Sequence, residues 1–398
     1  MQINTNGGYA IASGGFGCVF YPALKCANDE NRDKSKISKL LTRQNAINEY
    51  NEIKTLIPLL KQIHNYSNFF IVDNLNICNP DKLSDSDLID YNKRCSTLTK
   101  TNINNINSSL NKFLILNIPY GGITINNFIF KNYSYTNFIK LNNSLINLLL
   151  NGIIPMNKIN VYHCDIKDSN VVIDINENTL KPKLIDWGNS IISEPLNIPK
   201  RWINRPLQFN VPFSIIILSP IFFKKLHTFI NSANNSKQKT LNEYKEFMKD
   251  FLVFFLKNGL GHYTYIQYVF SVIFNNKHKK KYNNIIINYN ADILFNYLNK
   301  NKTTDINNLL TYFKVTYKKN VDIWGFVFTY FPVLEVLHKN QQTISLNEKK
   351  ILDKLKKIFI NYLYNTTNEI NVIDLINDLT NLDDKIKTHK RINIKNNF

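Results

Sequence analysis

The stretch of sequence that decides the fold reads Tyr162-His163-Cys164-Asp165-Ile166-Lys167-Asp168-Ser169-Asn170-Val171-Val172-Ile173. A polar loop is followed here by an apolar run, which predicts a strand leaving a turn. Taken alone, a loop rich in Asp and Asn is ordinary turn chemistry. Asp165, Lys167 and Asn170, however, follow a histidine at offsets that a simple turn does not require. The spacing therefore indicates a chemical role for these three side chains.

A second polar element is Lys183-Leu184-Ile185-Asp186-Trp187-Gly188, in which Asp186 lies 21 residues after Asp165. Its apolar residues predict a short strand over Lys183–Ile185. An Asp-Trp-Gly sequence can form an isolated β-turn, but here it directly follows a strand that comes soon after the first loop. We therefore take Asp186 as a further candidate site residue.

Glycines cluster near the start of the chain, in Ile11-Ala12-Ser13-Gly14-Gly15-Phe16-Gly17-Cys18-Val19. Short β-prone runs flank them within residues 7–26, which predicts a β-hairpin. Because glycine lacks a Cβ, such a turn allows the backbone to approach a ligand closely. Glycine turns occur in many hairpins, so this motif does not identify a ligand by itself.

Lys39 lies on a third predicted β segment, Ile37–Leu41. Apolar residues then recur with a helical period from Asn45 to Leu60. Glu49 and Glu52 are three residues apart on this predicted helix, so they lie on roughly one face. Only one of them can be expected to pair with Lys39.

Elsewhere, hydrophobic periodicity predicts strands at Phe69–Val72 and Phe113–Leu116, and helices at Tyr135–Leu150, through most of 213–317 and at Val321–Leu337. The segment Asn74–Lys112 is rich in Asn, Ser and Asp and only weakly periodic, which predicts an insertion or a long loop. The last of these helices opens with Val321-Asp322-Ile323-Trp324-Gly325.

Together these motifs resemble those of the protein-kinase superfamily. The first loop is similar to the kinase sequence His-Arg-Asp-Leu-x-x-x-Asn, with Cys164 in place of the arginine. The glycine-rich stretch is similar to the kinase glycine loop, with Ala12 at the place of the first glycine. Asp186-Trp187-Gly188 resembles Asp-Phe-Gly, and Asp322-Ile323-Trp324-Gly325 resembles the opening of the central C-lobe helix, whose Asp braces the catalytic loop.

The resemblance covers about residues 7–200 and 318–385. Within that superfamily, the sequence resembles most the divergent serine/threonine-protein kinases of large cytoplasmic DNA viruses. Three segments carry this closer similarity, namely Phe16–Cys26, Ile118–Thr124 and Arg205–Pro212.

The resemblance implies an ATP-dependent serine/threonine-protein kinase that uses Mg²⁺. Asp165 would be the catalytic base for the substrate hydroxyl, and Lys167 would neutralise charge on the transferring phosphoryl group. Asn170 and Asp186 would hold Mg²⁺. The implied catalytic residues are thus Asp165, Lys167 and Asn170.

The ATP-binding residues that the resemblance implies are Ile11, Ala12, Ser13, Gly14, Gly15, Phe16, Gly17, Cys18, Val19, Lys39 and Glu49. Lys39 would bind the α- and β-phosphates, paired with a glutamate of the following helix. Glu49 fits the Glu-Tyr pattern of divergent kinases, whereas Glu52 lies at the more usual distance from the lysine. We favour Glu49.

The implied fold is α+β and bilobal, with a β-rich N-lobe over residues 1–118 and a mainly helical C-lobe over 119–398. The N-lobe would contain the polar insertion at about 74–112. Asp322 lies 136 residues beyond the aspartate of the Asp-Trp-Gly motif, much farther than in ordinary protein kinases. The C-lobe would therefore contain a large insertion at about 213–317, which leaves the substrate-docking surface undefined.

The composition bounds the remaining choices. Hydrophobic residues make up 44% of the 398 residues, enough for a sizeable core, which excludes a wholly disordered protein. Lys and Arg number 49 against 30 Asp and Glu, a formal charge of +19. The lysines are scattered among Asn, Ile, Tyr and Phe, which all use A- and T-rich codons. Genome composition therefore explains the charge more simply than nucleic-acid binding, which we do not favour.

The five cysteines form no Cys-x-x-Cys pair and their number is odd, so we expect no disulfide framework, no zinc cluster and a reducing compartment. The chain starts without an apolar signal region. Its longest apolar run, Val211–Phe223, is shorter than the roughly 20 residues of a membrane span. The sequence predicts a soluble protein without a membrane span in the cytoplasm. For a viral protein this would be the host cytoplasm, and packaging in virions stays open.

Two other enzymatic or scaffold functions stay open. A small-molecule kinase of the aminoglycoside or choline type also has His-x-Asp with an Asn five residues on, but the glycine loop followed by Lys39 argues against it. A pseudokinase scaffold would have lost at least one phosphate-binding, metal-binding or catalytic side chain, and all of them are present. The physiological protein substrate is not indicated by the sequence.

Overall fold

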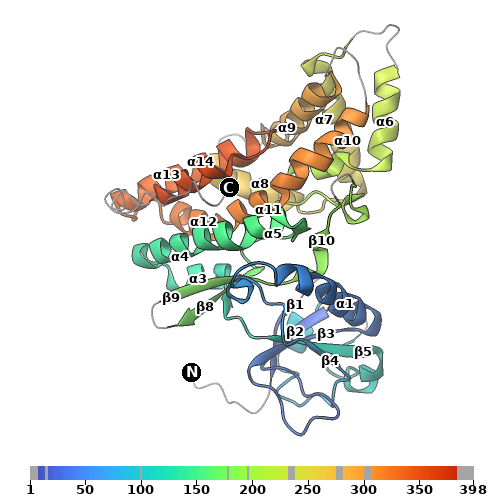
Figure 1. The fold of residues 1–398 in the computed structure, drawn as a ribbon, viewed down its shortest axis with the longest axis vertical. Helices are drawn as coiled ribbons and strands as arrows, with labels where there is room; N and C mark the ends of the chain where they lie inside the picture. Colours follow the sequence, from blue (N-terminus) through green and yellow to red (C-terminus); the bar gives the residue numbers. More distant parts are fainter. Residues whose placement is uncertain are drawn as a thin grey trace. The chain divides into compact units, whose positions relative to one another are not determined.

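The computed structural model of the protein describes residues 8–13, 17–98, 101–176, 179–194, 197–231, 238–274, 281–299 and 306–382. A β-sheet region at the N-terminal end is followed by helices, so the fold is α+β, as predicted (Figure 1). The chain forms two compact units, Met1–Gly122 with Lys183–Gly188, and Ile123–Pro182 with Asn189–Phe398. The first unit thus continues past the predicted limit at residue 118 and includes a second segment that carries Asp186.

The first unit is built on a five-stranded antiparallel sheet with the strand order β1-β2-β3-β5-β4. Its strands are β1 (Tyr9–Ser13), β2 (Gly17–Tyr21), β3 (Lys36–Thr42), β4 (Asn76–Cys78) and β5 (Phe113–Pro119). Helix α1 (Arg43–Leu60) follows β3 directly and packs against β3 and β5. Its buried residues Ala46, Ile53, Leu56 and Leu60 recur at helical spacing. The structure confirms the predicted hairpin, third strand and helix.

The predicted strand at Phe69–Val72 is wrong, because Phe70 forms only an isolated parallel bridge with Leu184. The Ile71 amide donates to the Leu184 carbonyl at 3.1 Å, and the Leu184 amide donates to the Phe69 carbonyl at 2.8 Å. The run is nevertheless buried, as predicted for apolar residues. A short apolar run signals burial, and only pairing with a neighbour over several residues makes it a strand.

The polar segment Asn74–Lys112 is not a simple loop. It carries β4, helix α2 (Tyr91–Arg94) and the 3-10 helix η2 (Asn107–Lys112). Its scattered apolar side chains are buried in one cluster with residues of β1, β2, β3 and β5: Leu83, Leu88, Tyr91, Leu98 and Ile106. The prediction missed this packing because the apolar residues occur singly or in pairs among many polar ones and leave no periodic signal.

Four of the five cysteines form two disulfides, Cys18–Cys95 and Cys26–Cys78. Their Cα atoms are 5.0 and 5.8 Å apart, within the usual range. The expectation of no disulfide framework is therefore wrong, and the cysteine count no longer supports a reducing compartment. Both pairs join residues that are far apart in sequence. The prediction rested on the number of cysteines and on local Cys-x-x-Cys spacing, and disulfide connectivity cannot be deduced from these. The remaining thiol, Cys164, is buried.

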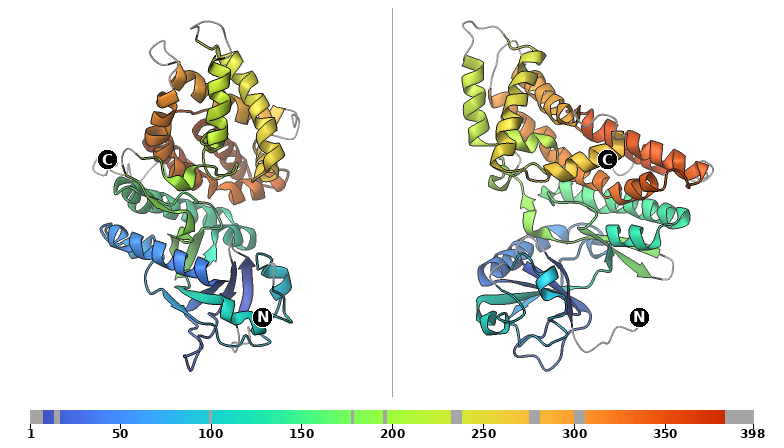
Figure 2. Two further views of the ribbon diagram at one scale, coloured as in Figure 1. Left: turned by 90° about the vertical axis from the view of Figure 1, so that its right-hand side faces the viewer. Right: turned by 180° about the vertical axis from the view of Figure 1, so that it is seen from behind.

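The second unit is mainly helical (Figures 1 and 2). Its first part contains β6 (Ile123–Thr124), α3 (Ile125–Asn132), α4 (Tyr135–Leu148), α5 (Ile154–Lys158), β7 (Val161–Tyr162), β8 (Val171–Asn176), β9 (Thr179–Leu184) and β10 (Ile191–Ile192). Its second part contains α6 (Pro220–Asn231), α7 (Leu241–Asn258), α8 (Tyr263–Phe274), α9 (Tyr282–Leu298), α10 (Ile306–Tyr312), α11 (Lys318–Phe328), α12 (Phe331–Lys339), α13 (Leu346–Phe359) and α14 (Val372–Thr380). Strands β6, β8 and β9 form one small sheet, and β7 and β10 form another.

The described part of 213–317 is mostly helical, as predicted, and its helices α7 and α9 pack along each other (Figure 2). The single helix predicted over Val321–Leu337 is instead two helices, α11 and α12, separated at Thr329 and Tyr330. Pro332 explains the break, because proline has no amide hydrogen and is tolerated in the first turn of a new helix. Almost every residue of α11 is buried, so this helix is the core of the second unit.

One stretch of the described helices, Asn307–Lys339, is long and apolar enough to cross a membrane by length and composition alone. Within the protein, 83% of its apolar window is buried. The buried core helix of a water-soluble domain has the same composition. The described residues therefore contain no clear membrane span.

Burial of the polar segment can be tested with two isoleucines that lie close together in sequence. Ile106 is 0% exposed and Ile103 is 42% exposed. Ile106→Ala should lower the free energy of unfolding by about 2–5 kcal/mol, because it leaves a cavity in the core. Ile103→Ala should change it by less than about 0.5 kcal/mol. Chemical denaturation measures both, and equal effects would contradict the packing described above.

Candidate functional site

Lys39 is the centre of a charged cluster in the first unit. Its Nζ lies 2.6 Å from Oε1 of Glu49, on α1, and 2.9 Å from Oδ1 of Asp186. The side chain of Lys39 is only 15% exposed and that of Glu49 only 12%. The structure thus brings Lys39, Glu49 and Asp186 together. Of the two glutamates that the sequence left as candidates, Glu49 is the one that contacts Lys39.

The two carboxylates keep the lysine charged. Burial by itself would lower the pKa of Lys39, because it disfavours the ammonium. The negative charges of Asp186 and Glu49 outweigh that effect and hold the pKa above its ordinary value. Lys39 therefore offers a permanent positive charge on a side chain that the surrounding structure holds in place.

Asp186 is held by the turn that carries it. Its backbone is left-handed, with φ of 65°, a conformation that Asp tolerates better than most residues. On one side, Leu184 pairs with Phe69 and Ile71 through backbone hydrogen bonds. On the other side, Trp187 is buried, donates from Nε1 to the Ile71 carbonyl at 3.2 Å and meets the Phe70 ring edge-on. The chain on both sides of Asp186 is thus fixed within the first unit.

The glycine-rich hairpin lies beside Lys39, because Val19 pairs with Ala12 of β1 and with Lys39 of β3. Gly14, Gly15 and Phe16 lie outside the described residues. At Gly17, a Cβ would come within 2.3 Å of the Leu40 carbonyl oxygen. Close packing of β2 on β3 therefore requires glycine at this position. Ile11, Ser13 and Cys18 belong to the same two strands.

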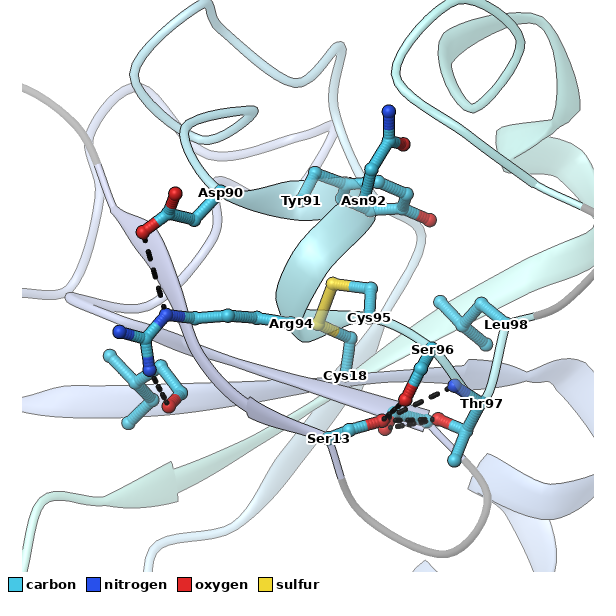
Figure 3. Close-up of a disulfide and its surroundings, with 12 residues drawn as sticks. Ser13, Cys18, Asp90, Tyr91, Asn92, Arg94, Cys95, Ser96, Thr97 and Leu98 are labelled. Carbon is cyan, nitrogen blue, oxygen red and sulfur yellow. Dashed lines mark hydrogen bonds and ion pairs between the residues drawn. A yellow bond between two sulfur atoms is a disulfide. The ribbon is translucent and has the colours of Figure 1, made fainter.

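A segment that sequence reasoning missed holds the hairpin (Figure 3). Arg94 donates from its guanidinium to the Ile11 carbonyl at 3.0 Å, and the Thr97 hydroxyl donates to the Gly17 carbonyl at 2.9 Å. The hydroxyls of Ser13 and Thr97 are 2.9 Å apart. The Cys18–Cys95 disulfide adds a covalent link between β2 and the same segment. The sequence contained both cysteines, but their spacing did not reveal that they pair.

In the second unit, the loop between β7 and β8 gathers its three predicted residues around one carboxylate. Asp165 is 5% exposed. Its Oδ2 accepts from Lys167 Nζ and from Asn170 Nδ2, each at 3.0 Å, and its backbone carbonyl accepts from Asn170 Nδ2 at 2.9 Å. Both partners of Asn170 Nδ2 are acceptors, so the amide nitrogen faces Asp165 and the amide oxygen points elsewhere.

Asp322, on α11, braces this loop as the resemblance implied. It is fully buried, and its Oδ1 accepts from the Cys164 amide at 2.7 Å while its Oδ2 accepts from the His163 amide at 2.9 Å and from Asn157 at 2.8 Å. Burial raises the pKa of Asp322, and these donors act in the opposite direction. The backbone of Cys164 is left-handed, with φ of 59°. Its amide is held by Asp322 and its carbonyl by Arg205, at 3.1 Å, so the bracing also fixes this uncommon conformation.

Two residues close to Asp165 escaped the motif search. Asn210 donates to Asp165 Oδ1 at 2.7 Å, and Arg205 bonds the carbonyl of the preceding residue. Both lie at least 35 residues beyond the loop in sequence, so no local spacing connects them to Asp165.

The donor atoms of Asp186 and Asn170 suit Mg²⁺, which takes carboxylate and amide oxygens and usually keeps water or substrate phosphates as further ligands. The Asp186 side chain is 40% exposed, so its carboxylate is accessible although it also bonds Lys39. The Asn170 amide oxygen is the part of that side chain directed away from Asp165. Within the described residues, no group of three or more His, Cys, Asp and Glu gathers to hold a metal. Asp186 and Asn170 would each offer Mg²⁺ an oxygen ligand, with water or phosphate as further ligands.

Comparison with protein-family models found no match for this chain, and comparison with curated proteins found no significant similarity. Neither result places the chain in a family. Its function must therefore be inferred from the residues and contacts described above.

The disulfide that holds the hairpin leads to a direct test. Thiol titration of the denatured, unreduced protein should find one thiol per chain, Cys164, whereas five would contradict both disulfides. Cys95→Ser should lower the free energy of unfolding by about 2–4 kcal/mol. Amide hydrogen exchange in β2 and in β1, which pairs with it, should also become faster, since the covalent link from β2 to the segment of Cys95 is lost. Cys78→Ser is the matched control, because it breaks the other disulfide and should leave exchange in β1 unchanged.

Proposed function

We propose that the protein is an ATP-dependent serine/threonine-protein kinase with a bilobal protein-kinase-like fold, the first unit being its N-lobe and the second its C-lobe. The observation that carries the proposal is the Lys39 ammonium held by Glu49 and Asp186. Lysine, glutamate and aspartate in this arrangement suit the binding of nucleotide phosphates and of their metal ion. The resemblance of the motifs to kinases of large cytoplasmic DNA viruses supports a viral protein in the host cytoplasm, whereas the two disulfides are uncommon in such a reducing compartment.

In this proposal, ATP supplies the γ-phosphoryl group and Mg²⁺ neutralises the charge that develops on it. Lys39 binds phosphate oxygens with its ammonium, and Glu49 keeps that ammonium in position. Asp186 offers its exposed carboxylate to the metal. Because the transfer needs little covalent chemistry from the protein, positioning and fixed charge are sufficient for catalysis.

The loop in the second unit would act on the other reactant. Asp165 orients the substrate hydroxyl and takes its proton, while the Lys167 ammonium, 3.0 Å from Asp165, neutralises charge on the group in transfer. Asn170 offers its amide oxygen to a second Mg²⁺. The side chains of Asp165 and Asn170 are nearly buried and bonded to each other, which supports a preorganised site.

One experiment separates this proposal from the two other functions. Purified protein is incubated with Mg²⁺ and labelled ATP together with casein, histone, an aminoglycoside or choline. We expect label on serine or threonine of the proteins. Label on the aminoglycoside or choline alone would indicate a small-molecule kinase, and no transfer to any acceptor would indicate a pseudokinase scaffold.

Substitutions in the Lys39 cluster test the nucleotide site. Lys39→Met and Asp186→Ala should each lower the transfer rate by about 10²-fold or more, because each removes a charge that stabilises the transition state. The control is Glu52→Gln, which changes the other glutamate of α1, the helix that carries Glu49. This variant should retain most of the activity. Thermal unfolding shows whether each variant is folded. A folded Lys39→Met or Asp186→Ala variant that keeps more than about a tenth of the rate would contradict these roles.

A further prediction concerns regulation. In many kinases the arginine next to the catalytic aspartate pairs with a phosphorylated residue, but a thiol such as Cys164 cannot make that bidentate contact. Ser190 and Ser193 are the only hydroxyl residues between Trp187 and Pro212, and they are 8% and 3% exposed. A buried hydroxyl is poorly accessible to another kinase.

Activity should therefore not depend on phosphorylation of this segment. Protein made in bacteria should be active, phosphatase treatment should leave its rate unchanged, and the double variant Ser190→Ala, Ser193→Ala should retain the rate if it folds. A loss of activity after phosphatase treatment, or a loss in the double variant that Asp at the same positions restores, would contradict this prediction.

A further inference from the structure

Asn210 is a buried side chain that is hydrogen-bonded to the carboxylate of Asp165. Asn210 is 0% exposed, and its Nδ2 donates to Asp165 Oδ1 at 2.7 Å and to the Ile166 carbonyl at 3.3 Å. The Ile166 carbonyl can only accept a hydrogen bond, and so can the Asp165 carboxylate when it is ionised. The amide nitrogen must therefore face the loop, and the opposite orientation of the side chain would place two acceptors against each other.

Asn210 is held in this position from two directions. The His262 amide donates to the Leu207 carbonyl at 2.8 Å, and Trp324 Nε1 donates to the Phe209 carbonyl at 2.9 Å. At Gly325 of α11, a Cβ would lie 3.2 Å from the Asn210 carbonyl oxygen and 2.5 Å from that of Ile166. The chain that carries Asn210 and the loop that carries Asp165 therefore both pack against the same glycine. That packing sets the distance between the two side chains.

The donors around Asp165 are distributed unequally over its two oxygens. Oδ2 accepts from Lys167 and from Asn170, each at 3.0 Å, and Asn189 approaches it at 3.5 Å. Among the described residues, Asn210 is the one donor bonded to Oδ1. A carboxylate has about four acceptor positions, two on each oxygen. Oδ2 is therefore saturated, whereas Oδ1 keeps one position for a further donor.

We propose that Oδ1 of Asp165 receives the proton of the substrate hydroxyl and that Asn210 is the positioning residue that aims it. The proposal rests on the kinase function proposed above. As the hydroxyl oxygen bonds to the γ-phosphorus, its proton passes to Oδ1. The bond between the γ-phosphorus and the bridging oxygen breaks, and its electron pair leaves with ADP. Asn210 does not touch the reacting atoms and acts by fixing the carboxylate plane.

The test compares two buried asparagines of the second unit. Asn210→Leu keeps the approximate shape of the side chain and removes the donor. Asn142→Leu is the control, because Asn142 is 1% exposed and makes equally good bonds, to the Leu379 carbonyl and from the Tyr330 hydroxyl. Its partners belong to α14 and to the turn between α11 and α12, and among the described contacts neither hydrogen-bonds the loop of Asp165. For each variant we would measure kcat, the KM for ATP with casein as acceptor, and the melting temperature.

For Asn210→Leu we expect kcat to fall by about 10²-fold, the typical effect of misplacing a catalytic group by about 1 Å. The KM for ATP should stay unchanged, because Asn210 contacts no residue of the Lys39 cluster among the described contacts. Asn142→Leu should lower the melting temperature and leave kcat unchanged. If Asn210→Leu does not fold, Asn210→Ala, which only removes atoms, gives the same comparison.

Three results would overturn the proposal. An unchanged kcat in Asn210→Leu or Asn210→Ala would remove the positioning role and leave the kinase function standing. An equal loss of kcat in Asn142→Leu would show that any weakening of the second unit has this effect, so Asn210 would have no special role. Absence of phosphoryl transfer by the wild-type protein would overturn the proposed function and this inference with it.

Discussion

The loop that carries Asp165 depends on one buried carboxylate, that of Asp322. A carboxylate without exposure to water is strongly disfavoured unless donors surround it. Asp322 meets this requirement with the backbone amides of His163 and Cys164 and the side chain of Asn157. These hydrogen bonds fix two consecutive peptide groups just before Asp165. They also hold Cys164, whose backbone is left-handed. Every hydrogen bond made by the Asp165 side chain presupposes that geometry.

The first unit also contains a poorly exposed charge that requires partners, but here the charge is positive. There a nearly buried ammonium, that of Lys39, requires carboxylates, and Glu49 and Asp186 supply them from segments 10 and 147 residues away. Removal of either partner leaves a charge without compensation in a poorly solvated place, which costs far more than an exposed pair. The charged side chains of the two candidate sites are thus also the ones whose pairing holds each unit in its local geometry.

The first unit depends on its polar segment more than its composition suggests. Within the segment Asn74–Lys112, five apolar side chains lie in the core of the sheet. Cys95 and Cys78 of the same segment form disulfides with Cys18 of β2 and with Cys26, which follows β2. Hydroxyls and a guanidinium from this segment bond the backbone of the hairpin. A segment built in this way adds a second support to the hairpin of β1 and β2.

Local sequence determined much of what the structure contains. Glycines between β-prone runs predicted the hairpin, a further β-prone run predicted β3, and helical period predicted α1. The spacing of Asp165, Lys167 and Asn170 indicated a chemical role, and the structure joins their side chains by hydrogen bonds. Each of these signals lies within a few residues of chain. Contacts between distant residues left no such signal. The choice of Glu49 over Glu52, the two disulfides, the burial of Asn74–Lys112 and the bond from Asn210 to Asp165 were decided only by tertiary packing. A helix or turn is a property of neighbours in sequence, whereas a buried charge or thiol takes its partner from whichever segment the fold brings within about 3 Å.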